Sequence, residues 1–373
     1  MQLQDLATPA LVLDRGRLDQ NLARMAARLR ARGVPLRPHV KTAKSLPVIA
    51  RALVGQPGGV TVSTLAEAEA CAAVGITDIL YAVGIAPQKL ERVAALRRRG
   101  ADVTVLLDSL DVAIAVRAAS ADSGVEFPAL IELDTDGHRA GVAPESSLVL
   151  EIARALGPLM RGVLTHAGES YNASDEAGIR AVAERERSGA VRAATALRAA
   201  GLNCPIVSVG STPTALLAAD LSGVTEVRAG VYMFMDLVMA GLGVCTIDEI
   251  AVSVLTTVIG HQREKGWLLT DAGWMSLSRD RGTASQPVDQ GYGLVCDLHG
   301  VPLGDLIVTG ASQEHGIIAS RNREAVDFAR FPVGTRLRVL PNHACATAAQ
   351  HASYQVVDGG AEVLAEWPRF SGW

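Results

Sequence analysis

The sequence predicts an α/β fold in which a (β/α)8 TIM barrel is followed by a C-terminal antiparallel β domain. From about residue 15 to residue 230, short apolar runs alternate with amphipathic stretches rich in Ala, Leu and Arg, which is typical of a parallel sheet. There are eight such runs, and eight strand–helix units fit a barrel better than a doubly wound sheet. After residue 241 the segments become short and rich in Val and Thr, and turn residues separate them. This pattern indicates antiparallel strands.

The apolar runs give the predicted barrel strands as 36–40, 59–62, 79–83, 103–107, 129–133, 162–165, 206–209 and 226–229. Helices are expected between them, including helices over 18–31 and 176–200. Another is expected to begin after Thr64, with Glu67 as the partner in a capping box.

The predicted strands of the β domain are 251–259, 267–270, 293–298, 305–308, 336–340 and 354–357. The opening segment 8–14 is also strand-like, and we expect it to pair with the C-terminal strands. The predicted domains are therefore a barrel over 15–240 and a β domain over 1–14 and 241–373. The change of pattern alone sets the limit near residue 240.

Composition favours a small-molecule partner. The net charge is −4, and Lys and Arg are scattered rather than clustered, so nucleic acid and anionic membranes are not expected partners. No apolar run approaches the roughly 20 residues of a membrane span, and the N-terminus has no signal-peptide pattern. Five widely spaced cysteines argue against a disulfide framework. We therefore expect a soluble, cytoplasmic protein.

Polar and glycine residues follow several of the predicted strands. In a parallel barrel, functional side chains lie where strands end, because the loops there converge over a filled core. A single lysine at the end of a strand is most often only a solvated charge. Here, however, polar or glycine residues stand at equivalent positions, directly after several of the strands. They are Lys41 after the first strand, Arg139 after the fifth, His166 after the sixth, Gly210, Ser211 and Thr212 after the seventh, and Gly230 after the eighth.

The loops after strands seven and eight are the usual phosphate site of a barrel. Glycine lets backbone N–H groups approach an oxyanion, and the Ser211 and Thr212 hydroxyls add donors. A structural turn is the alternative for Gly-Ser-Thr. A lysine facing a phosphate site suggests pyridoxal 5′-phosphate (PLP), with Lys41 as the Schiff-base lysine.

A second candidate site is His343-Ala344-Cys345, after the predicted strand 336–340. In extended backbone, the His343 and Cys345 side chains point to one face. Imidazole and thiolate suit Zn²⁺, with Mn²⁺ and Mg²⁺ as alternatives, and two protein ligands leave positions for water and substrate. The alternative is a buried cysteine beside a hydrogen-bonded histidine.

Five motifs together resemble the fold-type III, alanine-racemase-like PLP enzymes. They are Arg-Pro-His-Val-Lys-Thr at 37–42, Asp-Gly-His-Arg-Ala-Gly at 136–141, His166, Gly-Ser-Thr at 210–212, and Arg-Ala-Gly-Val-Tyr-Met-Phe-Met-Asp at 228–236. Within that fold the chain is most similar to the zinc-dependent D-serine dehydratase and D-threonine aldolase group. Ala43 departs from the pattern, because family members often have histidine there.

The resemblance implies roles for the site residues and a homodimer. It implies Lys41 as the catalytic Schiff-base residue, Arg139 near the phenolic oxygen of the cofactor, and His166 lining the ring. The residues implied around the phosphate are Gly210, Ser211, Thr212, Gly230 and Tyr232, and Tyr171 is a further candidate beside the cofactor. The family also carries His-x-Cys in dehydratases at the position where aldolases commonly have His-x-Asp.

These motifs predict a lyase that removes water from a D-3-hydroxy amino acid and gives a 2-oxo acid and ammonia. D-serine would give pyruvate, and D-threonine or a D-3-hydroxyaspartate are further substrates. The alternative is an aldolase that releases glycine and an aldehyde, and Cys345 favours the dehydratase. A non-catalytic PLP carrier would lack the β domain, and a racemase would need a second base.

Two further motifs have two interpretations each. They are Asp-Ala-Gly at 271–273 and Gln-Glu-His-Gly at 313–316. Each could lie around the substrate or the metal ligands, or could form a turn.

Overall fold

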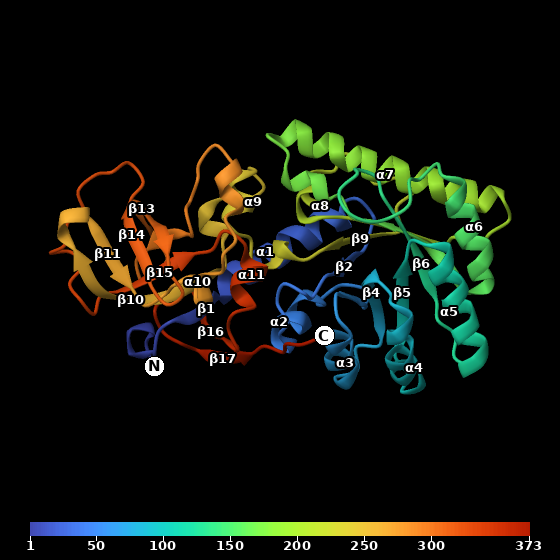
Figure 1. Ribbon diagram of the computed structural model, residues 1–373, viewed down its shortest axis with the longest axis horizontal. Helices are drawn as coiled ribbons and strands as arrows, with labels where there is room; N and C mark the ends of the chain where they lie inside the picture. The colour runs from blue at the N-terminus through green and yellow to red at the C-terminus, as the bar shows by residue number, and fades with distance from the viewer. The chain divides into compact units, whose positions relative to one another are not determined.

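The computed structural model describes all residues from Met1 to Trp373. The chain forms two compact units (Figure 1). The one we call the β unit comprises Met1–Ala23 and Val231–Arg369, and the barrel unit comprises Arg24–Gly230 and Phe370–Trp373. None of the helices combines the length and the apolar character needed to cross a bilayer.

The barrel unit contains the predicted eight parallel strands, in the order β2-β9-β8-β7-β6-β5-β4-β3. A parallel bridge between His39 and Thr61 joins the segments at β2 and β3, and the sheet therefore closes on itself. The prediction of a (β/α)8 barrel is confirmed. The strands are β2 (Leu36–Pro38), β3 (Val60–Val62), β4 (Asp78–Gly84), β5 (Asp102–Leu107), β6 (Ala129–Leu133), β7 (Met160–Thr165), β8 (Ile206–Val209) and β9 (Glu226–Ala229).

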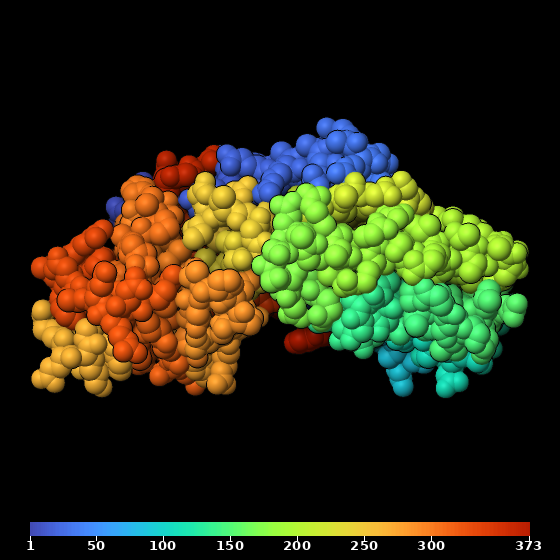
Figure 2. Space-filling model, turned by 90° about the horizontal axis from the view of Figure 1, so that it is seen from above, coloured from blue at the N-terminus to red at the C-terminus, as the bar shows by residue number.

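Helices follow the strands as predicted, and the green residues of α6 and α7 lie on the surface of this unit (Figure 2). The division between the two units falls within the first helix. The helices are α1 (Arg15–Arg30), α2 (Leu46–Ala52), α3 (Leu65–Ala73), α4 (Leu90–Arg98), α5 (Leu110–Ser123), α6 (Ser147–Leu156), α7 (Glu176–Ala199) and α8 (Thr212–Leu217).

Local sequence explains where several of these helices begin. The hydroxyl or carboxylate of Thr64, Ser109 or Asp175 accepts a backbone N–H from the first turn of the following helix, which satisfies a donor that has no partner within the helix. The capping box predicted at Thr64 forms only in part. The Glu67 carboxylate accepts the N–H of Ser63, at 2.9 Å, rather than that of Thr64.

The β unit contains a nine-stranded sheet in the order β11-β14-β13-β12-β15-β10-β1-β16-β17. An additional pairing of β10 with β11 closes six of these strands into a ring. The strands are β1 (Ala10–Asp14), β10 (Val252–Gln262), β11 (Trp267–Thr270), β12 (Leu294–Cys296), β13 (Pro302–Ala311), β14 (Gly316–Ser320), β15 (Arg336–Leu340), β16 (Ser353–Val357) and β17 (Ala365–Pro368).

The opening strand joins the C-terminal strands, as predicted. β1 pairs antiparallel with β10, where Leu11 lies opposite Val254, and parallel with β16. That last pairing is the exception to an otherwise antiparallel sheet. Three short helices, α9 (Leu237–Gly241), α10 (Trp274–Leu277) and α11 (Ala344–Ala348), complete this unit.

Candidate active site

Lys41 follows β2 on a backbone that both neighbouring strands hold. The N–H of His39 donates to the carbonyl of Ala229 at 2.7 Å, and the N–H of Val40 donates to the carbonyl of Thr61 at 2.9 Å. Lys41 itself is half-buried. Lys41 lies in the turn directly after the strand, and the neighbouring strands hold the two residues before it.

The electrostatics of two histidines show that the predicted barrel residues gather in one place. Burial lowers the pKa of His39 well below its ordinary value, and the positive charges of Lys41 and Arg228 lower it further. The His39 Nδ1 is shielded from solvent and has no hydrogen-bond partner. Arg139 contributes to the same effect, which brings it into this cluster although its side chain is exposed.

His166 is held as a neutral imidazole. Burial lowers its pKa to about 3, and the charges of Lys41 and Arg139 act in the same direction. Its Nδ1 lies 3.1 Å from the carbonyl oxygen of Gly210, so the neutral ring donates from Nδ1 and leaves Nε2 as the acceptor. The ring centroid of Tyr171 lies 6.3 Å from that of His166, tilted by 46°.

The Gly210 loop after β8 requires glycine. Its φ is +134°, and a Cβ there would lie 2.2 Å from the carbonyl oxygen of Arg228. The next residue, Ser211, caps α8: its Oγ accepts the N–H of Thr214 and lies 2.8 Å from the Oγ of Ser170. The Ser211 hydroxyl is therefore already engaged within the protein, while Thr212 is buried at the first position of α8.

The two remaining predicted cofactor residues lie at the end of the barrel unit and the start of the β unit. Gly230 packs against the lysine loop, since a Cβ there would lie 2.9 Å from the Oγ1 of Thr42. Tyr232 belongs to the β unit, where it is fully buried. Burial raises the pKa of its phenol.

The His343 and Cys345 pair is brought together, but the predicted extended backbone was wrong at Cys345. His343 is the N-cap of α11, and Cys345 lies in the first turn of that helix rather than on an extended strand. The two side chains still meet: although burial lowers the pKa of His343, hydrogen bonds to Asp280 and Cys345 raise it to about 11. No group of three or more His, Cys, Asp and Glu side chains is arranged for a metal ion.

Two carboxylates support this pair: Asp280, which the sequence analysis did not single out, and Asp236, which ends the motif at 228–236 but was given no role. The Oδ2 of Asp280 lies 2.7 Å from the Nδ1 of His343, which leaves the second ring nitrogen as the one able to bind a metal. Asp236 is buried and accepts the N–H of Ala344 at 3.0 Å. Burial raises the pKa of Asp236 to about 6.

The two remaining motifs take part in local structure. The Asp271 carboxylate accepts the hydroxyl of Thr256 and the N–H of Thr257, both at 2.8 Å. The segment 313–315 forms the turn between β13 and β14, where the N–H of Ser312 donates to the carbonyl of His315 at 2.8 Å. The contacts at 312–315 are those of a turn, whereas the Asp271 contacts join β10 to the segment after β11. A role of either motif around substrate or metal stays a prediction.

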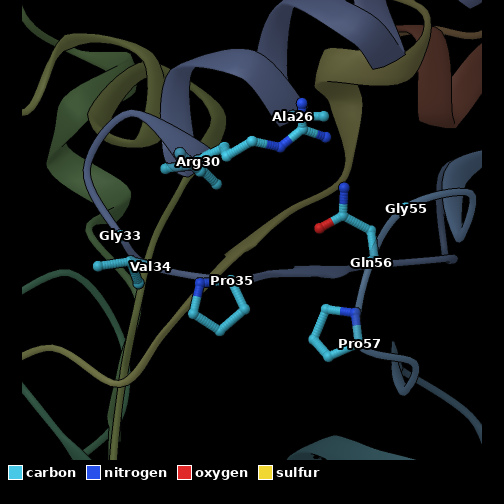
Figure 3. Close-up of a pocket in the computed structure, with 9 residues that line it drawn as sticks. Ala26, Arg30, Gly33, Val34, Pro35, Gly55, Gln56 and Pro57 are labelled. Carbon is cyan, nitrogen blue, oxygen red and sulfur yellow. The ribbon is translucent and has the colours of Figure 1, made fainter.

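A pocket of about 210 Å³ lies elsewhere in the barrel unit, at the amino-terminal end of β2 (Figure 3). Arg30 from the end of α1 and Gln56 from the loop before β3 provide its longer polar side chains. None of the predicted site residues lines it. The pocket is therefore separate from the candidate active site.

Comparison of the sequence with models of known protein families shows the family to which the chain belongs. The family "Alanine racemase, N-terminal domain" matches residues 13–238, and the family "Putative serine dehydratase domain" matches residues 251–357. The chain belongs to the fold-type III PLP family. The resemblance inferred from the five motifs is confirmed.

Individual relatives lie within the same group. The chain is 55% identical to a D-threo-3-hydroxyaspartate dehydratase of Delftia sp. (strain HT23), covering 100% of this chain and 99% of that protein. It is 28% identical to a D-serine dehydratase of Dictyostelium discoideum, covering 97% and 96%. The fold is shared along the whole length of the chain.

Solved structures with a similar fold belong to the same group of enzymes. The Delftia dehydratase superposes with a TM-score of 0.97 at 54% identity over 100% of both chains. Its structures include a variant with one histidine replaced by alanine and a variant with one cysteine replaced by alanine in a metal-free form. A D-threonine aldolase from Filomicrobium marinum superposes with a TM-score of 0.84 at 27% identity, covering 99% of this chain and 96% of that one.

Proposed function

We propose that this protein is a PLP- and metal-dependent dehydratase of D-3-hydroxy amino acids, which releases a 2-oxo acid and ammonia. The observation that carries the proposal is the 55% identity, over the whole chain, to a D-threo-3-hydroxyaspartate dehydratase. D-threo-3-hydroxyaspartate is therefore the first substrate to test, followed by D-serine and D-threonine. A cytoplasmic homodimer is part of the same proposal.

The residues at the barrel mouth fit PLP. They supply an amine, a guanidinium and a neutral imidazole within one electrostatic cluster, and the buried Nδ1 of His39 in that cluster has no partner within the chain. When bound, PLP draws electrons from the Cα of the substrate and weakens its C–H bond.

In this proposal the Lys41 amine would hold the aldehyde group of PLP, and the same amine, when free, would remove the Cα proton of the substrate. Arg139 would interact with the phenolic oxygen, and His166 would line the ring without adding a positive charge. Tyr171 is assigned to the same side of the cofactor. Gly210, Ser211, Thr212, Gly230 and Tyr232 are assigned to the phosphate group.

His343 and Cys345 fit a divalent metal because Asp280 occupies Nδ1 and leaves an imidazole nitrogen beside a thiol. Zn²⁺ is the expected ion, with Mn²⁺ and Mg²⁺ as alternatives. When bound, the metal is a Lewis acid that makes the β-hydroxyl group a better leaving group. Two protein ligands leave room for that hydroxyl and for water.

An aldolase is the second candidate, because the chain is also 28% identical to a 3-hydroxy-D-aspartate aldolase of Paracoccus denitrificans over 99% of this chain. The products separate the two reactions. We expect the purified protein, incubated with D-threo-3-hydroxyaspartate, D-serine or D-threonine, to release a 2-oxo acid and ammonia in equal amounts. Glycine and an aldehyde as the main products would replace the dehydratase with the aldolase.

A further inference from the structure

Glu186 is a buried carboxylate in the middle of α7 that binds two loops of the barrel mouth. It is 2% exposed. Its Oε1 accepts the N–H of Gly210 at 2.7 Å and the N–H of Ala167 at 3.1 Å. One oxygen atom therefore joins the loop after β7 to the loop after β8.

These two loops carry residues assigned to different parts of the cofactor. Ala167 directly follows His166, and Gly210 directly precedes Ser211 and Thr212. Gly210 is held from both sides, since its N–H donates to Glu186 and its carbonyl oxygen accepts from the Nδ1 of His166. A displacement of either loop would therefore be transmitted to the other.

The surroundings of Glu186 show that packing alone does not explain this residue. Its buried neighbours on α7 include Val182, Ala183 and Ala190, which are apolar, and a buried carboxylate is costly unless hydrogen bonds compensate for its desolvation. Burial raises the pKa of Glu186 to about 7. The Thr214 hydroxyl and the charge of Arg228 oppose that effect.

We propose that Glu186 is a positioning residue for the cofactor site, whose carboxylate oxygen sets the distance between the ring-side loop at His166 and the phosphate-side loop at Gly210–Thr212. This rests on the proposed PLP function. Glu186 touches neither cofactor nor substrate in this role. Its contribution is to accept two N–H donors that would otherwise be buried without partners.

The test compares PLP binding by the unmodified apoprotein, three variants at Glu186 and one control variant, with the dissociation constant read from the visible absorbance of bound PLP. Glu186→Gln keeps an acceptor oxygen at the same reach, so we expect affinity within about threefold of the unmodified protein. Glu186→Asp cannot reach both N–H groups, and Glu186→Ala has no acceptor, so both should bind PLP about tenfold or more weakly. Glu186→Asp carries the test if Glu186→Ala does not fold.

Leu197→Ala is the matched control, because Leu197 is fully buried on the same helix about three turns away. It should lower the melting temperature and leave PLP affinity unchanged. The inference is overturned if Glu186→Asp binds PLP as tightly as the unmodified protein, or if Leu197→Ala loses as much affinity as Glu186→Ala. Failure of the unmodified apoprotein to take up PLP would instead overturn the proposed function, and this inference with it.

Discussion

At the scale of single residues, the account depends on which lysine reacts. Lys41 and Lys44 are three positions apart, but the Nζ of Lys44 lies 3.2 Å from the Oε1 of the buried Glu67. Lys41→Ala should abolish both the covalent attachment of PLP and turnover, whereas Lys44→Ala should keep the attachment. Borohydride reduction followed by peptide mapping measures this directly, and label on a lysine other than Lys41 would refute the assignment.

Asp280 should set the affinity of the metal site. Losing a carboxylate that orients a metal-binding histidine typically costs about 10-fold to 100-fold in affinity, so Asp280→Ala should weaken metal binding to this extent in calorimetric titration of the metal-free protein. Asp289→Ala is the control. Asp289, like Asp280, accepts the N–H of the glycine two residues later, but it pairs with an exposed arginine instead of a histidine. Equal affinities in the two variants would contradict the role of Asp280.

Glu186 should make stability depend on pH. Burial raises its pKa in the folded protein to about 7, above the ordinary unfolded value of about 4.3. At pH values between these two, the folded state therefore binds more protons than the unfolded state. The free energy of unfolding of the apoprotein should therefore fall as pH rises from about 4.5 to 7. Urea titrations should show a smaller fall in Glu186→Gln, and identical pH profiles would rule out the raised pKa.

At the scale of elements, the loop after β8 combines helix capping with the proposed phosphate site. Ser211 caps α8, so Ser211→Ala should lower the free energy of unfolding by about 0.5–2 kcal/mol, as urea titration would measure. Thr212→Val keeps the volume of the side chain and removes its hydroxyl. Because Thr212 is assigned to the phosphate group, this variant should weaken PLP binding, and unchanged PLP affinity would place the phosphate elsewhere.

The elements also show what sequence patterns can predict. The barrel strands were predicted to within two residues, because most of them are apolar runs between polar loops. β14 and β17 were not predicted, since Gly316–Ser320 and Ala365–Pro368 are short and lack a clear alternation. The backbone is extended at His343, as predicted, but not at Cys345, because the Ala-Cys-Ala-Thr-Ala stretch after His343 forms a short helix.

The supporting residues could not be found from sequence, because their roles come from contacts between distant segments. Asp280 lies 63 positions from His343, and Glu186 lies 24 positions from Gly210. A lone glutamate on the apolar face of α7 was the only local signal for Glu186. Lys41 and His166, in contrast, could be predicted because each directly follows a barrel strand, and that position can be read from the nearby sequence alone.

At the scale of the whole molecule, all residues assigned to PLP except Tyr232 lie in the barrel unit, and both residues assigned to the metal lie in the β unit. The barrel unit contains Lys41, Arg139, His166 and the Gly210–Thr212 loop, while the β unit contains His343 and Cys345. Removal of the metal should therefore leave PLP bound. This separates a dehydratase that needs both groups from a racemase or a PLP carrier, which would need no metal.

The most direct test is turnover of D-threo-3-hydroxyaspartate by chelated protein, with metal content verified by elemental analysis. The account predicts that 2-oxo acid release stops, that the visible absorbance of bound PLP persists, and that added Zn²⁺, Mn²⁺ or Mg²⁺ restores release. Cys345→Ala should behave like the chelated protein. Full dehydratase turnover by metal-free protein would contradict the account and reduce His343 and Cys345 to structural residues.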